Sequence, residues 1–328
     1  MAHNTGNTTA FIEAEQYSNF ILQNLDDGLL PDSFTRDVSD FDMGTTLNIK
    51  TVGAATLQEV SEEVPLTYNA IDTGTVTLQI TDYIGDAWSI SDVLRQDGNQ
   101  IEALHALRGQ ESTRALQEYF ETRFMFVANE AQATGDVNAV NGFAHRWVAG
   151  IQTNDTENLM TQDDFRKMKL SFDKANVPQA GRIAIVDPVV EATLNALMTI
   201  TQPYNFNPQY EGIVNEGFAR EHRFVRNIFG WDIYTSNRLP ITAAETIDAS
   251  GHGGYSIVSA AGNVANLFMC VAGDQQKPIM RAWRQNPTVE TERNVKLKRD
   301  EYDVVARFGL GPQRVDTLGV ILTSAVNH

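Results

Sequence analysis

The sequence predicts an α+β fold. Residues 45–81 alternate apolar and polar side chains with a period of two, which indicates strands. Residues 97–133 carry the longest helical pattern in the chain. The C-terminal half contains a strand-to-helix unit followed by short apolar runs, which glycine, proline and asparagine separate. We therefore expect these runs to be strands joined by turns.

The N-terminal residues predict an arm that carries one helix. Residues 8–25 place apolar side chains at spacings that a helix gathers on one side, and Gly28 and Pro31 follow. This segment is too short to enclose a core of its own. We therefore expect an arm and not a domain.

The next segment predicts a projecting hairpin. Leu47 and Ile49 alternate with polar neighbours, and Val76 and Leu78 do the same further along the chain. Residues 58–74 between them are polar, acidic and rich in turn residues. Two strands with so little apolar material are unstable alone. We therefore expect the hairpin to project from the body of the protein and to be stabilised by contact with another protein surface.

The long helical pattern at residues 97–133 predicts one long, rigid helix. Asp97 or Asn99 is the expected N-cap, and Gly109 marks the place where a break or bend is expected. Further along, Thr161 and Asp164 predict a capping box. Residues 183–186 predict a buried strand that leads directly into a helix beginning at Asp187 and Pro188. The remaining strands are predicted at 231–235, 255–259, 266–272, 303–309 and 319–324.

The charge of the chain argues against a protein that grips nucleic acid. The 328 residues include 42 acidic and 25 basic side chains, giving a net charge of −17. Binding to phosphates requires concentrated lysine and arginine, which this composition lacks. The charge is uneven, because residues 1–100 are strongly acidic and residues 274–328 are slightly basic. Such contrast suggests contacts between parts of the chain or between copies.

No catalytic, cofactor-binding or metal-binding constellation is present in the sequence. The six histidines have no metal-ligand spacing, and neither a nucleophile elbow nor a phosphate-binding loop occurs. The single cysteine, Cys270, lies in an apolar run and is expected to be buried. The N-terminus lacks a secretion signal, and no stretch is long and apolar enough for a membrane span. An acidic cluster is left open as a solvated connector or a divalent-cation site: Asp32, Asp37, Asp40 and Asp42.

Four strings, in this order along the chain, carry a resemblance to a known family. They are YIGDAWSISDVLRQDGNQIEALHALRGQESTRALQEYF at 83–120, VPQAGRIAIVDPVVEATL at 177–194, FVRNIFGWDIYTSNRLP at 224–240 and DEYDVVARFGLGPQRVDTLGVIL at 300–322. Together with the order of elements, they resemble the major capsid proteins of tailed bacteriophages, which have the Hong Kong 97-type fold. The first string is similar to coat proteins of short-tailed phages in particular.

The resemblance implies a division of the chain into five segments. They are an N-terminal arm at 1–44, an extended loop at 45–85, a peripheral domain with the spine helix at 86–150, an axial domain at 151–273, and a return to the peripheral domain at 274–328. Lys50 is the only lysine in residues 1–100 and lies at the base of the hairpin. This position argues against the covalent crosslinking that some members of the family use.

The resemblance also implies a function and partners. The chain is expected to be a structural virion protein and not an enzyme, assembling in the host bacterial cytoplasm into pentamers and hexamers of an icosahedral shell that encloses double-stranded DNA. Expected partners are further copies of the chain, a separate scaffolding protein, a portal protein and, where one is present, a decoration protein, without any membrane or cofactor. Two alternatives remain open, an encapsulin-type protein compartment and a metal-dependent cytoplasmic enzyme that uses Asp40 and Asp42.

The charge contrast predicts one contact between copies. The acidic hairpin of one subunit is expected to lie against a basic face of its neighbour. The alternative is that the glutamates of the hairpin only face solvent and keep its tip hydrated. The acidic residues are Glu59, Glu62 and Glu63, and the basic candidates are Arg281, Arg284, Arg293, Lys296 and Lys298.

Overall fold

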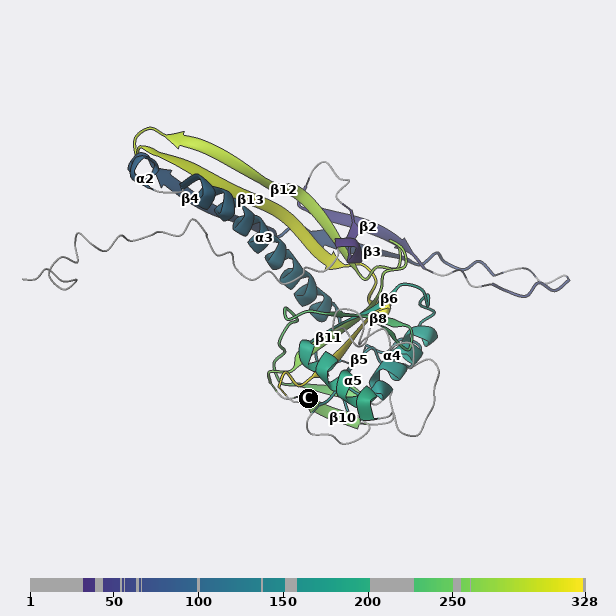
Figure 1. Cartoon of the computed structure of the whole chain (residues 1–328). Helices are drawn as coiled ribbons and strands as arrows, with labels where there is room; N and C mark the ends of the chain where they lie inside the picture. Colours follow the sequence, from purple (N-terminus) through teal and green to yellow (C-terminus); the bar gives the residue numbers. More distant parts are fainter. Residues whose placement is uncertain are drawn as a thin grey trace, which may run out of the picture. The chain divides into compact units, whose positions relative to one another are not determined.

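The structure is a computed structural model in which the chain forms two compact units (Figure 1). Among the described residues, the smaller unit holds 85–115 and 289–304, and the larger unit holds 32–84, 116–288 and 305–326. The described ranges are 32–38, 44–53, 55, 57–62, 65, 67–98, 101–136, 138–150, 158–200, 227–249, 255–259 and 261–326. The helix expected at 8–25 lies outside them.

A six-stranded sheet forms the centre of the larger unit, with the order β5-β14-β11-β6-β8-β7. Strand β11 pairs antiparallel with both β14 and β6, whereas β6 pairs parallel with β8. The strands are β5 (Arg146–Val148), β6 (Arg182–Val186), β7 (Asn227–Ile228), β8 (Trp231–Thr235), β11 (Val264–Cys270) and β14 (Leu318–Thr323).

Both faces of this sheet are covered. Ile185 belongs to a buried cluster with Met125 of α3 (Ile101–Ala131), whereas its neighbour Ala184 belongs to a second cluster with Phe165 of α4 (Gln162–Lys174). Every residue of β6, β11 and β14 is buried. Strands buried on both faces read as continuous apolar runs, which is why the sequence predicts them well.

The helices that flank this sheet begin where the sequence predicts. The Asp164 carboxylate accepts hydrogen bonds from the backbone nitrogen of Thr161, at 2.9 Å, and from its hydroxyl, at 2.7 Å, at the start of α4. Helix α5 (Pro188–Ile200) follows β6 directly, and the Asp187 carboxylate accepts a hydrogen bond from the Val189 backbone at 3.0 Å. The predicted capping box and strand-to-helix unit are confirmed.

The long helix differs from the prediction at its start and in its middle. Asp97 is the last residue of a separate helix, α2 (Asp92–Asp97), which the Ser91 hydroxyl caps by accepting from Leu94 at 3.2 Å. Helix α3 then begins at Ile101 and continues without a break through Gly109, where an added Cβ would meet nothing within 4 Å. The predicted cap at Asp97 and the predicted break at Gly109 are therefore wrong, whereas the alternative cap, Asn99, lies outside the described residues.

A four-stranded sheet has the order β1-β12-β13-β4. Its strands are β1 (Arg36–Asp37), β4 (Asp82–Ser91), β12 (Ile279–Asn294) and β13 (Arg299–Pro312). The sequence predicts only the middle of β13, because β4 and β12 are strands of mixed composition. Half-buried and exposed residues alternate strictly along β4, and β12 is mostly exposed from Arg284 onward.

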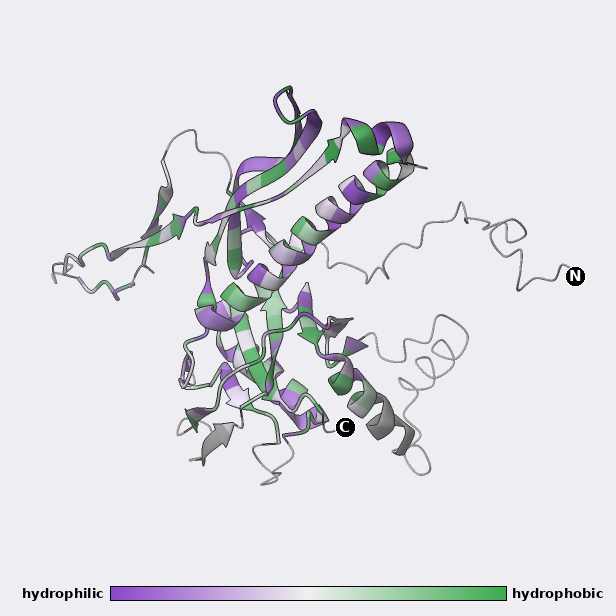
Figure 2. Cartoon of the chain, turned by 90° about the vertical axis from the view of Figure 1, so that its left-hand side faces the viewer, coloured by the Kyte–Doolittle hydropathy of each residue, from purple (hydrophilic) through white to green (hydrophobic). Residues whose placement is uncertain are grey.

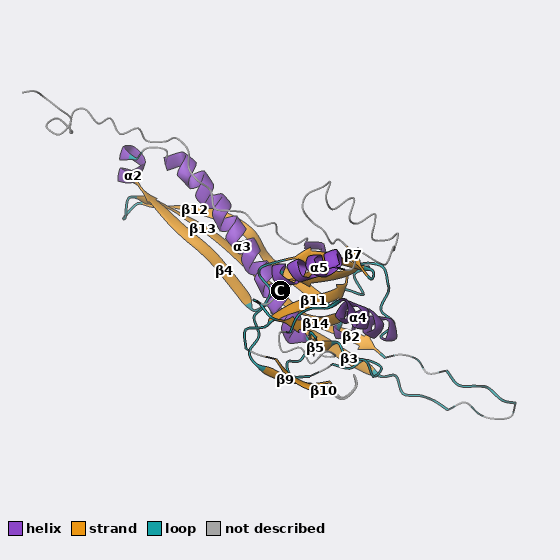
Figure 3. Cartoon of the chain, turned by 60° about the horizontal axis from the view of Figure 1, so that its bottom comes forward, coloured by secondary structure: helices purple, strands orange, loops and turns teal. Residues whose placement is uncertain are grey.

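The predicted hairpin is confirmed as β2 (Thr46–Val52) and β3 (Thr73–Gln79), which pair antiparallel with Leu47 opposite Leu78. Leu78 is fully buried and forms a small core with Met280 of β12. Strands β9 (Glu245–Ala249) and β10 (Tyr255–Ser259) form a further antiparallel pair (Figure 3). None of the described helices is long and apolar enough to cross a membrane.

Candidate functional site

The loop that connects β2 and β3 exposes large apolar side chains. We call this loop, residues 53–72, the hairpin end. Leu57 is 94% exposed and Tyr68 is 100% exposed, and hydrophobic residues recur along the loop among hydrophilic ones (Figure 2). Isolated exposed leucines are common on protein surfaces, but the described residues of the hairpin end include four exposed large apolar side chains, which are Leu57, Val60, Tyr68 and Ile71.

The hairpin end is held in shape without a core. The Gln58 side-chain amide donates to the Thr67 carbonyl at 2.7 Å, and its oxygen accepts from the Thr67 backbone nitrogen at 3.1 Å. The Gly53 backbone nitrogen donates to the Asp72 carbonyl at 2.8 Å. The Gln58 side chain thus makes the two hydrogen bonds across the loop that a paired backbone residue would make in a sheet. The geometry presents the apolar side chains to solvent and leaves them available to a partner.

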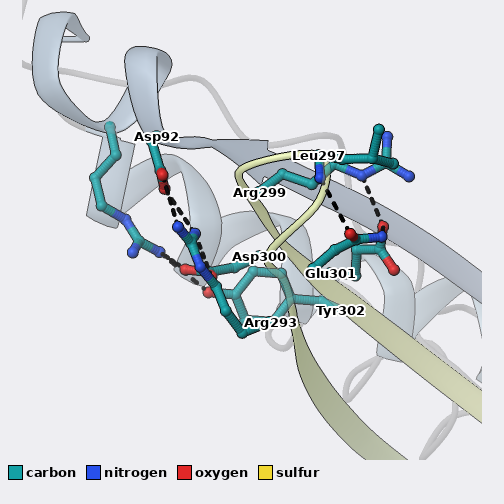
Figure 4. Close-up of polar contacts among 9 residues, drawn as sticks. Asp92, Arg293, Leu297, Arg299, Asp300, Glu301 and Tyr302 are labelled. Atoms are coloured by element: carbon teal, nitrogen blue, oxygen red, sulfur yellow. Dashed lines mark hydrogen bonds and ion pairs between the residues drawn. The ribbon is translucent and has the colours of Figure 1, made fainter.

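The smaller unit carries a network of charged side chains that we call the distal clamp, formed by Asp92, Arg95, Arg293 and Asp300 (Figure 4). The Arg293 guanidinium donates to both oxygens of Asp92 at 2.6 Å and to Asp300 at 2.8 Å. Arg95 lies 2.6 Å from Asp300. Bidentate pairs of this kind fix orientation more strongly than single contacts. The clamp therefore ties the first residue of α2 to strands β12 and β13.

The clamp stabilises the ionised state of its carboxylates. Hydrogen bonding to Arg293 lowers the pKa of Asp92 and the pKa of Asp300 below the ordinary aspartate range. The same bonds, first to Asp92 and then to Asp300, raise the pKa of Arg293. The four groups are therefore charged at neutral pH.

The turn between β12 and β13 lies next to the clamp and is rich in exposed apolar and basic residues. Val295 and Leu297 are 65% and 57% exposed, and Lys296 and Lys298 are exposed beside them. The Lys298 carbonyl accepts from the Asp92 backbone nitrogen at 3.0 Å. This turn thus combines apolar surface with two cations, whereas the hairpin end combines apolar surface with carboxylates.

The structure divides the predicted contact residues into several groups. Glu59 and Glu62 are exposed on the hairpin end, whereas Glu63 lies outside the described residues. Arg293 is engaged by Asp92 and Asp300, and Arg281 lies 3.9 Å from Asp37. The sequence did not show these pairings, because 201 positions separate Arg293 from Asp92. Arg284, Lys296 and Lys298 lie on exposed positions of β12 and of the following turn.

The other predicted features are tested only in part. Cys270 is buried as expected. Asp32 and Asp37 are described, whereas Asp40 and Asp42 lie outside the described residues. Within the described part of the chain, no group of three or more histidine, cysteine, aspartate or glutamate side chains is arranged to hold a metal ion.

The fold is that of capsid shell subunits. A subunit of the capsid of the cyanophage P-SCSP1u superposes with a TM-score of 0.70 and 16% identity, covering 99% of this chain and 96% of the other. The mature capsid of bacteriophage PhiM1 gives a TM-score of 0.69 and 14% identity over 96% and 93%. The capsid of a native GTA particle gives 0.60 and 11% over 99% and 100%. These likenesses establish the Hong Kong 97-type α+β fold.

The sequence model of a family described as phage capsid protein matches residues 73–323, so the chain belongs to that family. It is a structural, shell-forming protein of the virion, a major capsid protein that associates with further copies of itself. Neither the family nor the structural neighbours support an encapsulin-type compartment or a metal-dependent enzyme. No curated protein matches the sequence.

Proposed function

We propose that this chain builds the pentamers and hexamers of an icosahedral shell that encloses double-stranded DNA. The observation that carries the proposal is the hairpin end, whose Leu57 and Tyr68 are almost fully exposed in the single chain. Exposed apolar clusters of this kind mark surfaces that bind a partner. In a shell, each hairpin end would lie on a neighbouring copy and bury these side chains, which supports assembly through apolar contact.

The proposed segments each have a role in this assembly. Residues 1–44 serve as an arm, 45–85 as the extended loop, 86–150 as a peripheral domain with the spine helix, 151–273 as an axial domain around the capsomer axis, and 274–328 as the return to the peripheral domain. Proposed partners are a separate scaffolding protein, a portal protein and a decoration protein where one is present, and the proposed place of assembly is the host bacterial cytoplasm. Because each subunit carries a net charge of −17, the shell would enclose DNA without binding its phosphates tightly.

Within this assembly, we place the carboxylates of the hairpin end against the turn between β12 and β13 of another copy. Glu59 and Glu62 are exposed, and Glu63 adjoins them in the sequence. Lys296 and Lys298 support the contact best, because Arg293 is already engaged in the distal clamp. Arg281 and Arg284 remain secondary candidates. Each exposed ion pair contributes only about 0–1 kcal/mol, so charge would set register while apolar burial supplies most of the free energy.

A charge-reversal experiment tests this contact. The double variant Glu59→Lys/Glu62→Lys should lower the yield of particles in sedimentation and negative-stain electron microscopy. Adding Lys296→Glu/Lys298→Glu should restore part of the yield, because opposite charges then face each other again. The matched control is Glu290→Lys/Glu292→Lys, which makes the same charge change at exposed positions of β12. Unchanged yield in the first variant, or no restoration in the combined variant, would remove this contact from the account.

A further inference from the structure

The larger unit contains an apolar groove that its described residues leave open. Its lining includes three aromatic rings in mutual contact, in which Phe120 stacks on Trp283 with centroids 5.3 Å apart and the ring centroid of Trp283 lies 5.0 Å from that of Phe308. The cavity measures about 440 Å³, which is far more than one water molecule needs. We call it the aromatic groove, and its apolar walls are Phe34, Leu116, Phe120, Phe124, Trp283 and Phe308.

The rim of the aromatic groove suits a peptide segment. Gln117 of α3 and Asn286 of β12 line it and are exposed, and neither side chain forms a hydrogen bond within the described part of the chain. A side-chain amide both donates and accepts hydrogen bonds, so two amides at a rim match the alternating N–H and C=O groups of a peptide backbone. An apolar floor with amides at its edge therefore fits a short segment with apolar side chains.

The segment that directly precedes the groove wall in sequence has this composition. Phe34 is 5% exposed and lines the groove, and Leu29, Leu30 and Pro31 come just before the described residues begin at Asp32. A chain extends by at most about 3.6 Å per residue, so the four residue steps that separate Leu30 from Phe34 in sequence span at most roughly 15 Å. We propose that the aromatic groove binds Leu29 and Leu30 of the same chain.

The short tether favours the same chain over another copy. A short linker holds its ligand at an effective concentration on the order of millimolar, above the concentration that a separate copy reaches at micromolar protein. The two leucines would bridge Phe120 and Phe124 of α3 to Trp283 and Phe308 of the sheet. They would thereby fix the point from which the N-terminal residues leave the larger unit. This inference concerns the single chain and does not depend on shell assembly.

A disulfide experiment on the full chain tests the proposal. Cysteines are introduced by Leu30→Cys and Asn286→Cys, the protein is oxidised at micromolar concentration, and the products are separated by non-reducing gel and peptide mass spectrometry. A disulfide requires Cα atoms within about 7 Å, so an intrachain bond in most molecules is the expected result. The control pair, Leu30→Cys with Thr122→Cys, places the second cysteine at an exposed position of α3 outside the groove and should not crosslink. Disulfide-linked dimers would assign the groove to a second copy, and absence of the bond would overturn the proposal.

A second readout uses Trp283, which is one of four tryptophans. Its fluorescence is isolated as the difference between proteins with and without Trp283→Phe. The variant Leu29→Asp/Leu30→Asp should raise the acrylamide quenching constant of Trp283 at least twofold, because the groove would lose its cover. The control Leu57→Asp, at a position 94% exposed on the hairpin end, should leave that constant unchanged. An unchanged constant in the leucine variant would contradict the proposal even if the variant assembles normally.

Discussion

Leu57 gives the sharpest test of the hairpin end. Its side chain is 94% exposed in the single chain, so almost all of its apolar surface is available for burial against a neighbour. Full burial of a leucine contributes about 1.5–3 kcal/mol, and 1.4 kcal/mol corresponds to a tenfold change in an equilibrium constant. With one such contact per subunit, Leu57→Ser should raise the protein concentration at which particles first form by about ten- to a hundredfold.

The assay measures this threshold concentration by light scattering and counts particles by electron microscopy. The folded subunit should keep its stability, because substitutions of exposed residues usually change the free energy of unfolding by less than about 0.5 kcal/mol. Leu57→Met retains the apolar surface and serves as the control, with a threshold close to that of the unmodified chain. A normal threshold in Leu57→Ser would refute the reasoning that the hairpin end is buried against a neighbour.

Three further predictions concern the fold. Arg293→Ala removes the partner of Asp92 and Asp300 and should speed amide hydrogen exchange in α2, with exchange in β11 unchanged as the control. Burial raises the pKa of Asp164, so its ionisation should lower the free energy of unfolding as the pH rises above the ordinary aspartate value of about 3.9, and urea unfolding of Asp164→Asn should lack this decrease. Gly309→Ala should lower the free energy of unfolding by about 1–3 kcal/mol, because its Cβ would clash with the backbone of residues 79 and 80.

Each of these predictions has a contradicting outcome. Unchanged exchange in α2 would show that the distal clamp does not hold this helix. A pH dependence that is the same in Asp164→Asn would mean that other groups cause it. A Gly309→Ala protein of normal stability would show that the neighbouring strand moves aside without cost.

The sequence predicted the elements whose signals are local. Residues 183–186 of strand β6 form a continuous apolar run, and Asp187 and Pro188 mark the start of the next helix within two residues. By contrast, the sequence does not indicate β12, because most of its residues after Arg284 are exposed and polar and no hydrophobic period distinguishes them from a loop. Its pairing with β1 joins residues 36–37 to residues 280–281 and is therefore a long-range property.

The candidate site was predictable only where charge alone defines it. Glu59 and Glu62 stand out in an acidic loop, and the structure leaves them exposed. Arg293 belongs to the basic C-terminal segment, yet its partner Asp92 is 201 positions away and cannot be found by spacing. No pattern in the sequence distinguishes the exposed Leu57 and Tyr68, because a loop gives no periodic signal that separates apolar contact residues from buried ones.

The most direct test of the central claim is cryo-electron microscopy of the purified chain, with a scaffolding protein supplied where assembly requires it. The account predicts closed icosahedral particles in which residues 53–72 of each subunit lie on a neighbouring subunit, with Leu57 and Tyr68 buried in the contact. Particles in which these side chains remain in solvent, or a protein that stays monomeric at every concentration, would contradict it.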